Sequence, residues 1–285
     1  MPSGAPVGVT GSTGRLGGRV ARLLAAAGLE QRLVVRSPAR APVLPGTTVA
    51  EASYADRDAV RRALDGLDVV LMVSAAESAN RLDEHRAFVD AAAEAGVGHL
   101  VYVSFYGAAP EATFTLARDH HATERHVEDA GMRWTFLRDN LYLDFFPMLA
   151  GEDGVIRGPA GDGRVAAVAQ DDIAACVATV LLDPAAHEGR TYSLTGPESL
   201  TLAEAAETMT RILGRPFSFV DETVEEAYGS RAGYGAPSWQ LDAWVSTYTA
   251  IASGELAGVT GDVERLTGHA PRSLEDVLTA PGDDA

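Results

Sequence analysis

The stretch from Val7 to Gly18 constrains the fold of this chain more than any other. It reads Val-Gly-Val-Thr-Gly-Ser-Thr-Gly-Arg-Leu-Gly-Gly, so short apolar residues lead into Gly11, Gly14 and Gly17. The next residues follow a helical period, and the apolar positions on one face are Leu16, Val20, Leu23, Leu24 and Ala27. This pattern predicts a strand, a tight turn and a helix.

The spacing of the three glycines has a physical reason. Gly11 permits a turn that a Cβ atom would block, Gly14 lets a pyrophosphate approach the main chain, and Gly17 lets the helix lie close to the strand. The free amides of the first helical turn and the helix dipole then face the phosphates. The sequence therefore favours a dinucleotide site, and the alternative is a glycine-rich turn that only packs a helix on a sheet.

Composition limits the class of protein. The chain has 285 residues, of which 46% are hydrophobic, and it has no apolar run long enough to cross a bilayer. The first residues lack the basic and apolar regions of a signal peptide, and the single cysteine, Cys176, cannot form an internal disulfide. We therefore expect a soluble, globular, cytoplasmic protein.

The charged residues exclude several functions. The net charge of −17 repels phosphate backbones and anionic lipids, so we expect a small-molecule substrate and neither nucleic acid nor membrane as a partner. All 23 basic residues are arginine. The absence of lysine excludes Schiff-base chemistry, P-loop phosphate transfer and the Tyr-x-x-x-Lys pair of ordinary short-chain dehydrogenases.

The order of the predicted elements indicates the architecture. Buried strands alternate with amphipathic helices, which is typical of a doubly wound parallel α/β sheet, the Rossmann arrangement. The strands are expected at 31–35, 48–52, 68–75, 99–105, 134–137 and 190–194, and the helices at 56–64, 81–95 and 116–131. We expect an NAD(P)-binding domain at 1–155, whose last strand returns at 189–196, and a smaller, mainly helical substrate lobe at 156–285.

The end of the second strand predicts the cofactor. An acidic residue about 20 positions after the glycines would bind the ribose 2′-hydroxyl, whereas an arginine there accommodates a 2′-phosphate. Arg36 stands at this point and is followed by Ser37 and Arg40. We therefore predict NADP(H), with Arg15 as a second phosphate contact. The alternative is that Arg36 only caps an exposed strand end.

Further site residues are expected where other strands end. Ser74 and Ala75 are small, which lets a cofactor lie close to the carboxyl edge of the sheet. Ser104, Phe105 and Tyr106 end the following strand. We expect Ser104 to contact the cofactor and the two aromatic residues to contact the substrate.

A polar and aromatic segment follows the strand at 134–137. Asn140 is followed by Tyr142, Phe145 and Phe146. Such side chains would suit the wall of a pocket for a flat apolar ligand, and we name Asn140, Tyr142 and Phe146 as substrate contacts. The alternative, that these aromatic side chains are plain core, is left open.

The predicted helix at 116–131 carries His120, His121, Glu124, His126 and Glu128. These residues miss the spacings of zinc-binding helices and have no cysteines near them, so we predict no metal. The other alternative to a catalytic role is an exposed polar face, with Glu124 and Glu128 paired to arginines of the same helix. This alternative explains Glu128 well and His120 less well.

Several segments together resemble one family. They are Thr10–Gly17, Val34–Pro38, Val101–Ser104, Ala117–Glu124, Leu137–Asn140 and Gln170–Ala174, and they resemble the NmrA-like, atypical short-chain dehydrogenases. The chain looks most similar to the branch of type-2 NADPH-dependent quinone oxidoreductases, over about residues 5–200. Members of this family have a Rossmann domain and a small C-terminal domain, with the active cleft between them, and many bind NADP(H).

The resemblance implies roles for individual residues. The pyrophosphate would lie on Thr10, Gly11, Ser12, Thr13, Gly14, Arg15 and Leu16. The 2′-phosphate would lie on Arg36, and the nicotinamide near Ser74, Ala75, Ser104 and Asn140. His120 stands about where related reductases carry a lysine, which implies contact with cofactor or substrate.

The missing tyrosine–lysine pair bears on the chemistry. Hydride reduction of an ordinary ketone creates an alkoxide that needs a positioned acid, whereas a quinone gives a delocalised anion that solvent can protonate. We therefore predict NADPH-dependent hydride transfer to a quinone or a similarly activated aromatic or enone acceptor, with His120 or Tyr106 as the catalytic proton donor or orienting group.

Two other functions stay open on the sequence alone. One is a non-catalytic regulatory protein that senses NADP(H), and the other is a reductase or isomerase that tailors one specific metabolite. The oligomeric state is open too, with a homodimer as one alternative.

Overall fold

The computed structural model describes residues 6–280. Their contacts divide the chain into two compact units. The first unit takes 6–110, 119–138 and 173–192, and the second takes 111–118, 139–172 and 193–280. The expected domain boundary at 155 therefore lies inside the second unit, because the chain passes between the units several times.

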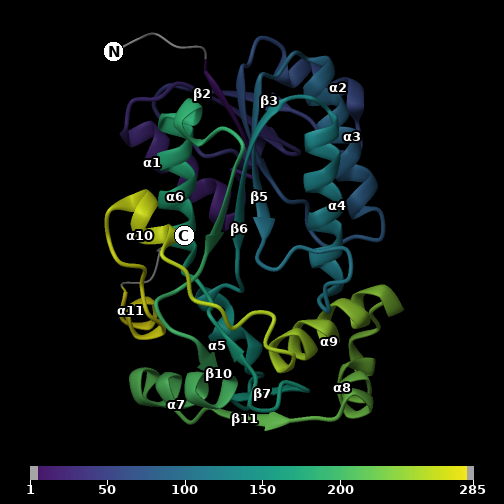
Figure 1. Ribbon diagram of the computed structural model, residues 1–285, viewed down its shortest axis with the longest axis vertical. Coiled ribbons are helices and arrows are strands. Elements are labelled where there is room, and N and C mark those ends of the chain that lie inside the picture. Colours follow the sequence, from purple (N-terminus) through teal and green to yellow (C-terminus); the bar gives the residue numbers. More distant parts are fainter. Residues whose placement is uncertain (1–5, 281–285) are drawn as a thin grey trace. The chain divides into compact units, whose positions relative to one another are not determined.

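A seven-stranded sheet forms the framework of the first unit (Figure 1). Its strands are β1 (Val7–Thr10), β2 (Gln31–Val35), β3 (Thr47–Glu51), β4 (Val69–Val73), β5 (His99–Phe105), β6 (Arg133–Asp139) and β9 (Arg190–Leu194). They are arranged in the order β3-β2-β1-β4-β5-β6-β9, and the pairs β1/β2, β1/β4, β2/β3 and β4/β5 are parallel. The order reverses between β1 and β4, and ligands of such sheets bind where the strand order reverses, at the carboxyl ends of the strands.

Helices cover both faces of this sheet. α1 (Arg15–Ala26) and α6 (Gln170–Leu182) lie on one face, and α2 (Arg57–Leu64), α3 (Arg81–Glu94) and α4 (Thr115–Asp129) lie on the other (Figure 1). The second face is packed by a core in which Leu64, Phe88 and Val127 meet Met72 and Phe136. Every residue of β5 is buried, as expected for a strand covered on both sides. The doubly wound parallel fold predicted from the sequence is confirmed.

The second unit is mainly helical, with short strands. Its helices are α5 (Phe146–Leu149), α7 (Leu202–Leu213), α8 (Val224–Arg231), α9 (Ser238–Ala252), α10 (Asp262–Thr267) and α11 (Leu274–Thr279). Its strands are β7 (Val155–Gly158), β8 (Arg164–Val165), β10 (Leu200–Thr201) and β11 (Ser218–Asp221). β7 pairs with β11 in parallel, and β8 pairs with β10 in antiparallel, so β7 and β8 do not form a hairpin with each other.

Local signals in the sequence explain where several helices begin. Asp56 caps α2, because its side chain accepts a hydrogen bond from the amide of Ala59 at 2.9 Å. Thr201 and Thr223 begin α7 and α8 with reciprocal capping boxes.

No helix within residues 6–280 combines the length and the apolar character needed to cross a membrane.

Candidate functional site

The turn between β1 and α1 is built around three glycines. Gly11 has a φ of +68°, and a Cβ atom added there would lie 3.0 Å from Cβ of Val73. The amide of Gly14 closes the turn by donating to the carbonyl oxygen of Gly11 at 2.9 Å. A Cβ atom at Gly17 would overlap the carbonyl group of Gly11 and approach the amide nitrogen of Ser12 to 2.9 Å. Gly17 therefore packs the helix against the turn itself, whereas the glycine spacing predicted contact with the strand.

The amino end of α1 fits a pyrophosphate. Gly14 is its N-cap residue, no side chain caps the first turn, and that turn contains no acidic residue. The side chain of Ser12 is buried, and its hydroxyl has no hydrogen-bonding partner among residues 6–280. Uncapped amides, the positive end of the helix dipole and an unpaired hydroxyl in one turn together offer donors to an anion.

Arg36 lies directly after β2, at the same carboxyl edge. Its side chain is exposed, and the structure records no ion pair between it and a carboxylate within residues 6–280. Burial raises the pKa of the Tyr54 hydroxyl, and the charge of Arg36 opposes that rise, so the guanidinium lies near this tyrosine. An unpaired arginine at this edge fits the 2′-phosphate of NADP(H).

Thr10 and Tyr54 hold β1 and β4 together below the turn. The Thr10 hydroxyl accepts a hydrogen bond from the amide of Val73 at 2.9 Å, and the Tyr54 hydroxyl lies 2.6 Å from the Thr10 hydroxyl and 2.7 Å from the carbonyl oxygen of Val73. Thr10 is fully buried. These contacts support the cofactor loop from within the unit, and pyrophosphate contact by Thr10 stays a prediction.

The chain that leaves β4 is held by a buried polar network. Nε2 of His85 lies 2.9 Å from the amide of Ala75, and Nε of Arg81 donates to the carbonyl oxygen of Ala75 at 3.0 Å. Arg81 also contacts Nε2 of His120 at 2.8 Å, and Nδ1 of His120 lies 2.8 Å from the hydroxyl of Tyr102. Burial, reinforced by the charge of Arg81, lowers the pKa of His85 to about 3 and that of His120 well below its ordinary value.

Ser104, at the end of β5, belongs to a second buried group. Its hydroxyl donates to Oε1 of Glu124 at 2.7 Å, and Arg138 binds both oxygens of the same carboxylate at 2.8 and 2.5 Å. Ser104 and Glu124 are buried. Glu124 is therefore a buried carboxylate paired with Arg138 of β6 and not with an arginine of its own helix, so an exposed polar face does not describe this side of α4.

Phe105 and Tyr106 differ in exposure. The Phe105 side chain is buried, and its ring centroid lies 6.0 Å from that of His120. Tyr106 is half-buried, and no partner of its hydroxyl is recorded within residues 6–280. Of the two residues predicted as proton donors, Tyr106 therefore has its hydroxyl available, whereas both ring nitrogens of His120 are engaged.

Asn140, Tyr142 and Phe146 belong to the second unit. The amide of Asn140 is fully buried, donating to the carbonyl oxygen of Leu256 at 3.0 Å and accepting from the amide of Leu141 at 2.8 Å. Phe146 is also buried, and the half-buried Tyr142 donates its hydroxyl proton to Asp139 at 2.7 Å. The Phe146 side chain is therefore part of the core, which was the alternative left open by the sequence. Ligand contact by Asn140, Tyr142 and Phe146 stays a prediction.

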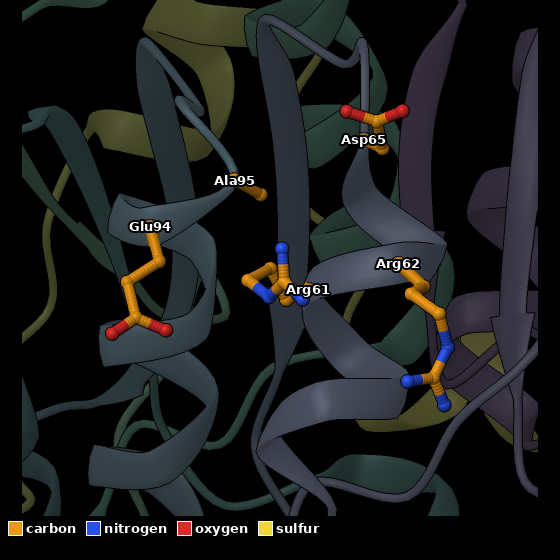
Figure 2. Close-up of a pocket in the computed structure, with 5 residues that line it drawn as sticks. All are labelled: Arg61, Arg62, Asp65, Glu94 and Ala95. Atoms are coloured by element: carbon orange, nitrogen blue, oxygen red, sulfur yellow. The ribbon is translucent and has the colours of Figure 1, made fainter.

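One surface pocket lies away from the proposed site. Figure 2 shows its lining residues, which come from the ends of α2 and α3 and the residues that follow them: Arg61, Arg62, Asp65, Glu94 and Ala95. These helix ends lead into the starts of β4 and β5, so the pocket lies at the amino edge of the sheet. Across residues 6–280, no group of three or more His, Cys, Asp and Glu side chains is placed to hold a metal ion.

Three residues at the carboxyl edge of the sheet were not among the predicted site residues: Tyr54, Arg81 and His85. One signal in the sequence could have found His85. It lies on the same helical face as Phe88, Val89 and Ala92, where a polar side chain needs a buried partner.

Comparison with known proteins agrees with this geometry. A protein-family model described as NAD(P)H-binding matches residues 11–184. The chain is 36% identical over 275 residues to a (4-alkanoyl-5-oxo-2,5-dihydrofuran-3-yl)methyl phosphate reductase of Streptomyces griseus, covering 94% of this chain and 95% of the relative. It is 32% identical to an NAD(P)H azoreductase of Xenophilus azovorans, covering 95% and 96% of the two chains.

A solved structure extends the match to three dimensions. The NADPH-dependent quinone oxidoreductase of Escherichia coli, complexed with NADPH, aligns with a TM-score of 0.87 and 30% identity over 96% of this chain and 98% of that one. The glycine turn, the uncapped α1 and the strand order thus occur together with extended similarity in sequence and structure. The chain belongs to the NAD(P)H-binding family.

Proposed function

We propose that this chain, an NAD(P)H-dependent oxidoreductase, transfers a hydride from NADPH to a quinone or a similarly activated conjugated acceptor. One observation carries the choice of cofactor. The uncapped amino end of α1 and the unpaired Arg36 lie at the same edge of the sheet, so one can hold the pyrophosphate while the other holds the 2′-phosphate.

The relatives support the class of acceptor. Their names give an acyl dihydrofuranone, an azo compound and a quinone as substrates. All three are conjugated electrophiles, and addition of a hydride to each gives an anion that neighbouring atoms can share. Reduction of such acceptors needs no lysine–tyrosine pair, and this chain contains no lysine.

We propose distinct roles for the side chains near the carboxyl edge. Bound NADPH supplies the hydride, and the protein positions the two reactants and excludes water. His120 acts as an orienting group, because its ring nitrogens already contact Arg81 and Tyr102. Tyr106 supplies a proton where the acceptor needs one. The second unit, which contains Asn140 and Tyr142, acts as the substrate-binding lobe.

Removal of the Arg36 side chain tests the cofactor choice. In an R36A variant we expect kcat/KM for NADPH to fall about 10- to 100-fold and that for NADH to stay nearly unchanged, because a charge-assisted contact to phosphate is lost. The assay follows oxidation of each reduced cofactor with a panel of quinones. R61A is a matched control, since Arg61 lines the pocket at the opposite edge. Equal losses with both cofactors would overturn the assignment of Arg36.

Loss of the Tyr106 hydroxyl tests the proton donor. We expect Y106F to slow turnover of an azo acceptor by about 100-fold, because the anion formed on nitrogen needs a proton, and to change quinone turnover by less than about threefold. The measurement compares kcat for the two acceptors at saturating NADPH. Unchanged azo reduction would exclude Tyr106 as the donor.

NADPH binding without oxidation of NADPH by any acceptor of the panel would instead favour a sensor. The cytoplasmic location and the oligomeric state stay predictions.

A further inference from the structure

The main chain just after β4 is held by side chains instead of neighbouring strands. The last residue of β4 with a recorded partner in β5 is Val73, opposite Val103. Beyond it, the amide and the carbonyl oxygen of Ala75 are both bound by α3, through His85 and Arg81 respectively. Residues 74–80 read Ser-Ala-Ala-Glu-Ser-Ala-Asn, so few large apolar side chains are available to fix this segment by packing.

The direction of each hydrogen bond around His85 follows from the Ala75 amide. A backbone N–H can only donate, so Nε2 of His85 must be the acceptor and the proton of the neutral ring must sit on Nδ1. Nδ1 lies 2.9 Å from the hydroxyl of Thr123, which donates onward to the carbonyl oxygen of Asp119 at 2.8 Å. Thr123, from α4, thereby selects the tautomer of His85 that can hold Ala75.

Arg81 fixes the other half of the network in the same way. A guanidinium only donates, so Nε2 of His120 accepts and its Nδ1 proton points to the hydroxyl of Tyr102. The charge of Arg81 is balanced by Asp119, whose carboxylate lies 3.4 Å away. Arg81 is 4% exposed and His85 is fully buried. The two side chains that bind Ala75 are therefore each held by a buried partner, His85 by Thr123 and Arg81 by His120.

We propose that His85 and Arg81 are positioning residues that set the peptide group of Ala75 for the bound dinucleotide. We call their two contacts to Ala75 the peptide clamp. The inference rests on the proposed function, together with the nicotinamide contact that the family resemblance implies for Ser74 and Ala75. The clamp orders this segment before the cofactor arrives. Binding therefore does not lose free energy to the conformational entropy of ordering the segment.

A pair of substitutions at His85 separates positioning from packing. Leucine fills the site but cannot accept a hydrogen bond, whereas the amide oxygen of glutamine can accept the Ala75 proton where Nε2 stood. We expect H85L to weaken NADPH binding about tenfold and H85Q to stay within about threefold of the unchanged protein. H126L is a matched control, because His126 also joins α4 to α3, through Asp90 at 2.8 Å, without contacting Ala75.

Two readouts are needed. NADPH affinity is measured by fluorescence titration, and amide hydrogen exchange of Ala75 is measured by NMR without cofactor, together with the melting temperature of each variant. We expect faster exchange at Ala75 in H85L and restored protection in H85Q, with H126L unchanged in both exchange and affinity.

Each outcome decides a separate claim. Unchanged exchange at Ala75 in H85L would overturn the clamp. Faster exchange with unchanged NADPH affinity would overturn its positioning role and leave a structural one. Equal loss of affinity in H85L and H85Q, with a lowered melting temperature in both, would also overturn that role. Failure of the unchanged protein to bind NADPH would overturn the proposed function and the positioning role with it. Amide hydrogen exchange at Ala75 would still test whether the clamp exists.

Discussion

Replacement of Gly17 by alanine is expected to weaken NADPH binding by about 100-fold or more. The added methyl group would overlap the carbonyl group of Gly11 and lie 2.9 Å from the amide nitrogen of Ser12. Both contacts are with backbone, which cannot rotate away as a side chain can. The turn must shift by about 1 Å, and a displacement of that size in a positioned site costs about 100-fold or more.

Gly18 provides the matched control for this prediction. A Cβ atom at Gly18 would lie 3.1 Å from the carbonyl oxygen of Ser12 and 3.6 Å from Arg22, so small shifts relieve both contacts. Alanine also favours the helix over glycine by about 1 kcal/mol, which offsets the strain. We expect G18A to bind NADPH nearly as well as the unchanged protein in fluorescence titration. Tight binding by G17A would show that α1 can move away from the turn without loss of the site.

The elements around the glycine turn show what the sequence can predict. The strand, the turn and α1 lie within about 20 residues, so spacing alone identifies them, and the expected strands and helices of the sheet end within two residues of the observed ones. Arg36 could be placed for the same reason, since it ends the strand that follows α1. Periodicity and strand order therefore predicted the part of the site that is built from consecutive elements.

The remaining contacts join residues far apart in the chain. His85 meets Thr123 across 38 residues, and Asn140 meets Leu256 across 116. A histidine in an apolar helix face indicates that some partner exists, but its identity depends on how two helices pack. The sequence context pointed to His120 as a site residue. Its neutral state follows from its burial and from the guanidinium of Arg81, which donates to its Nε2 atom.

The two neutral histidines also make stability depend on pH. Burial lowers the pKa of His85 to about 3, and that of His120 lies well below its ordinary value, so the folded protein leaves both unprotonated at mildly acid pH. In the unfolded chain a histidine binds a proton below about pH 6.5. The unfolded state then holds more protons than the folded state, and the free energy of unfolding falls as pH decreases. The loss continues until the folded pKa of about 3 is reached for His85.

We expect His85 and His120 together to lower the free energy of unfolding by about 3 kcal/mol between about pH 8 and about pH 5.5, roughly half from each. Burial also lowers the pKa of His99 and of His187, and both add to the drop. Chemical denaturation at the two pH values measures the drop. A carboxyl group opposes it at lower pH, since burial raises the pKa of Asp119, and this sets the lower limit of the range. In H85Q the drop should be about 1.5 kcal/mol smaller than in the unchanged protein, because glutamine does not titrate. An equal drop in H85Q would mean that the folded protein can protonate His85, which the Ala75 amide does not permit unless the peptide clamp opens.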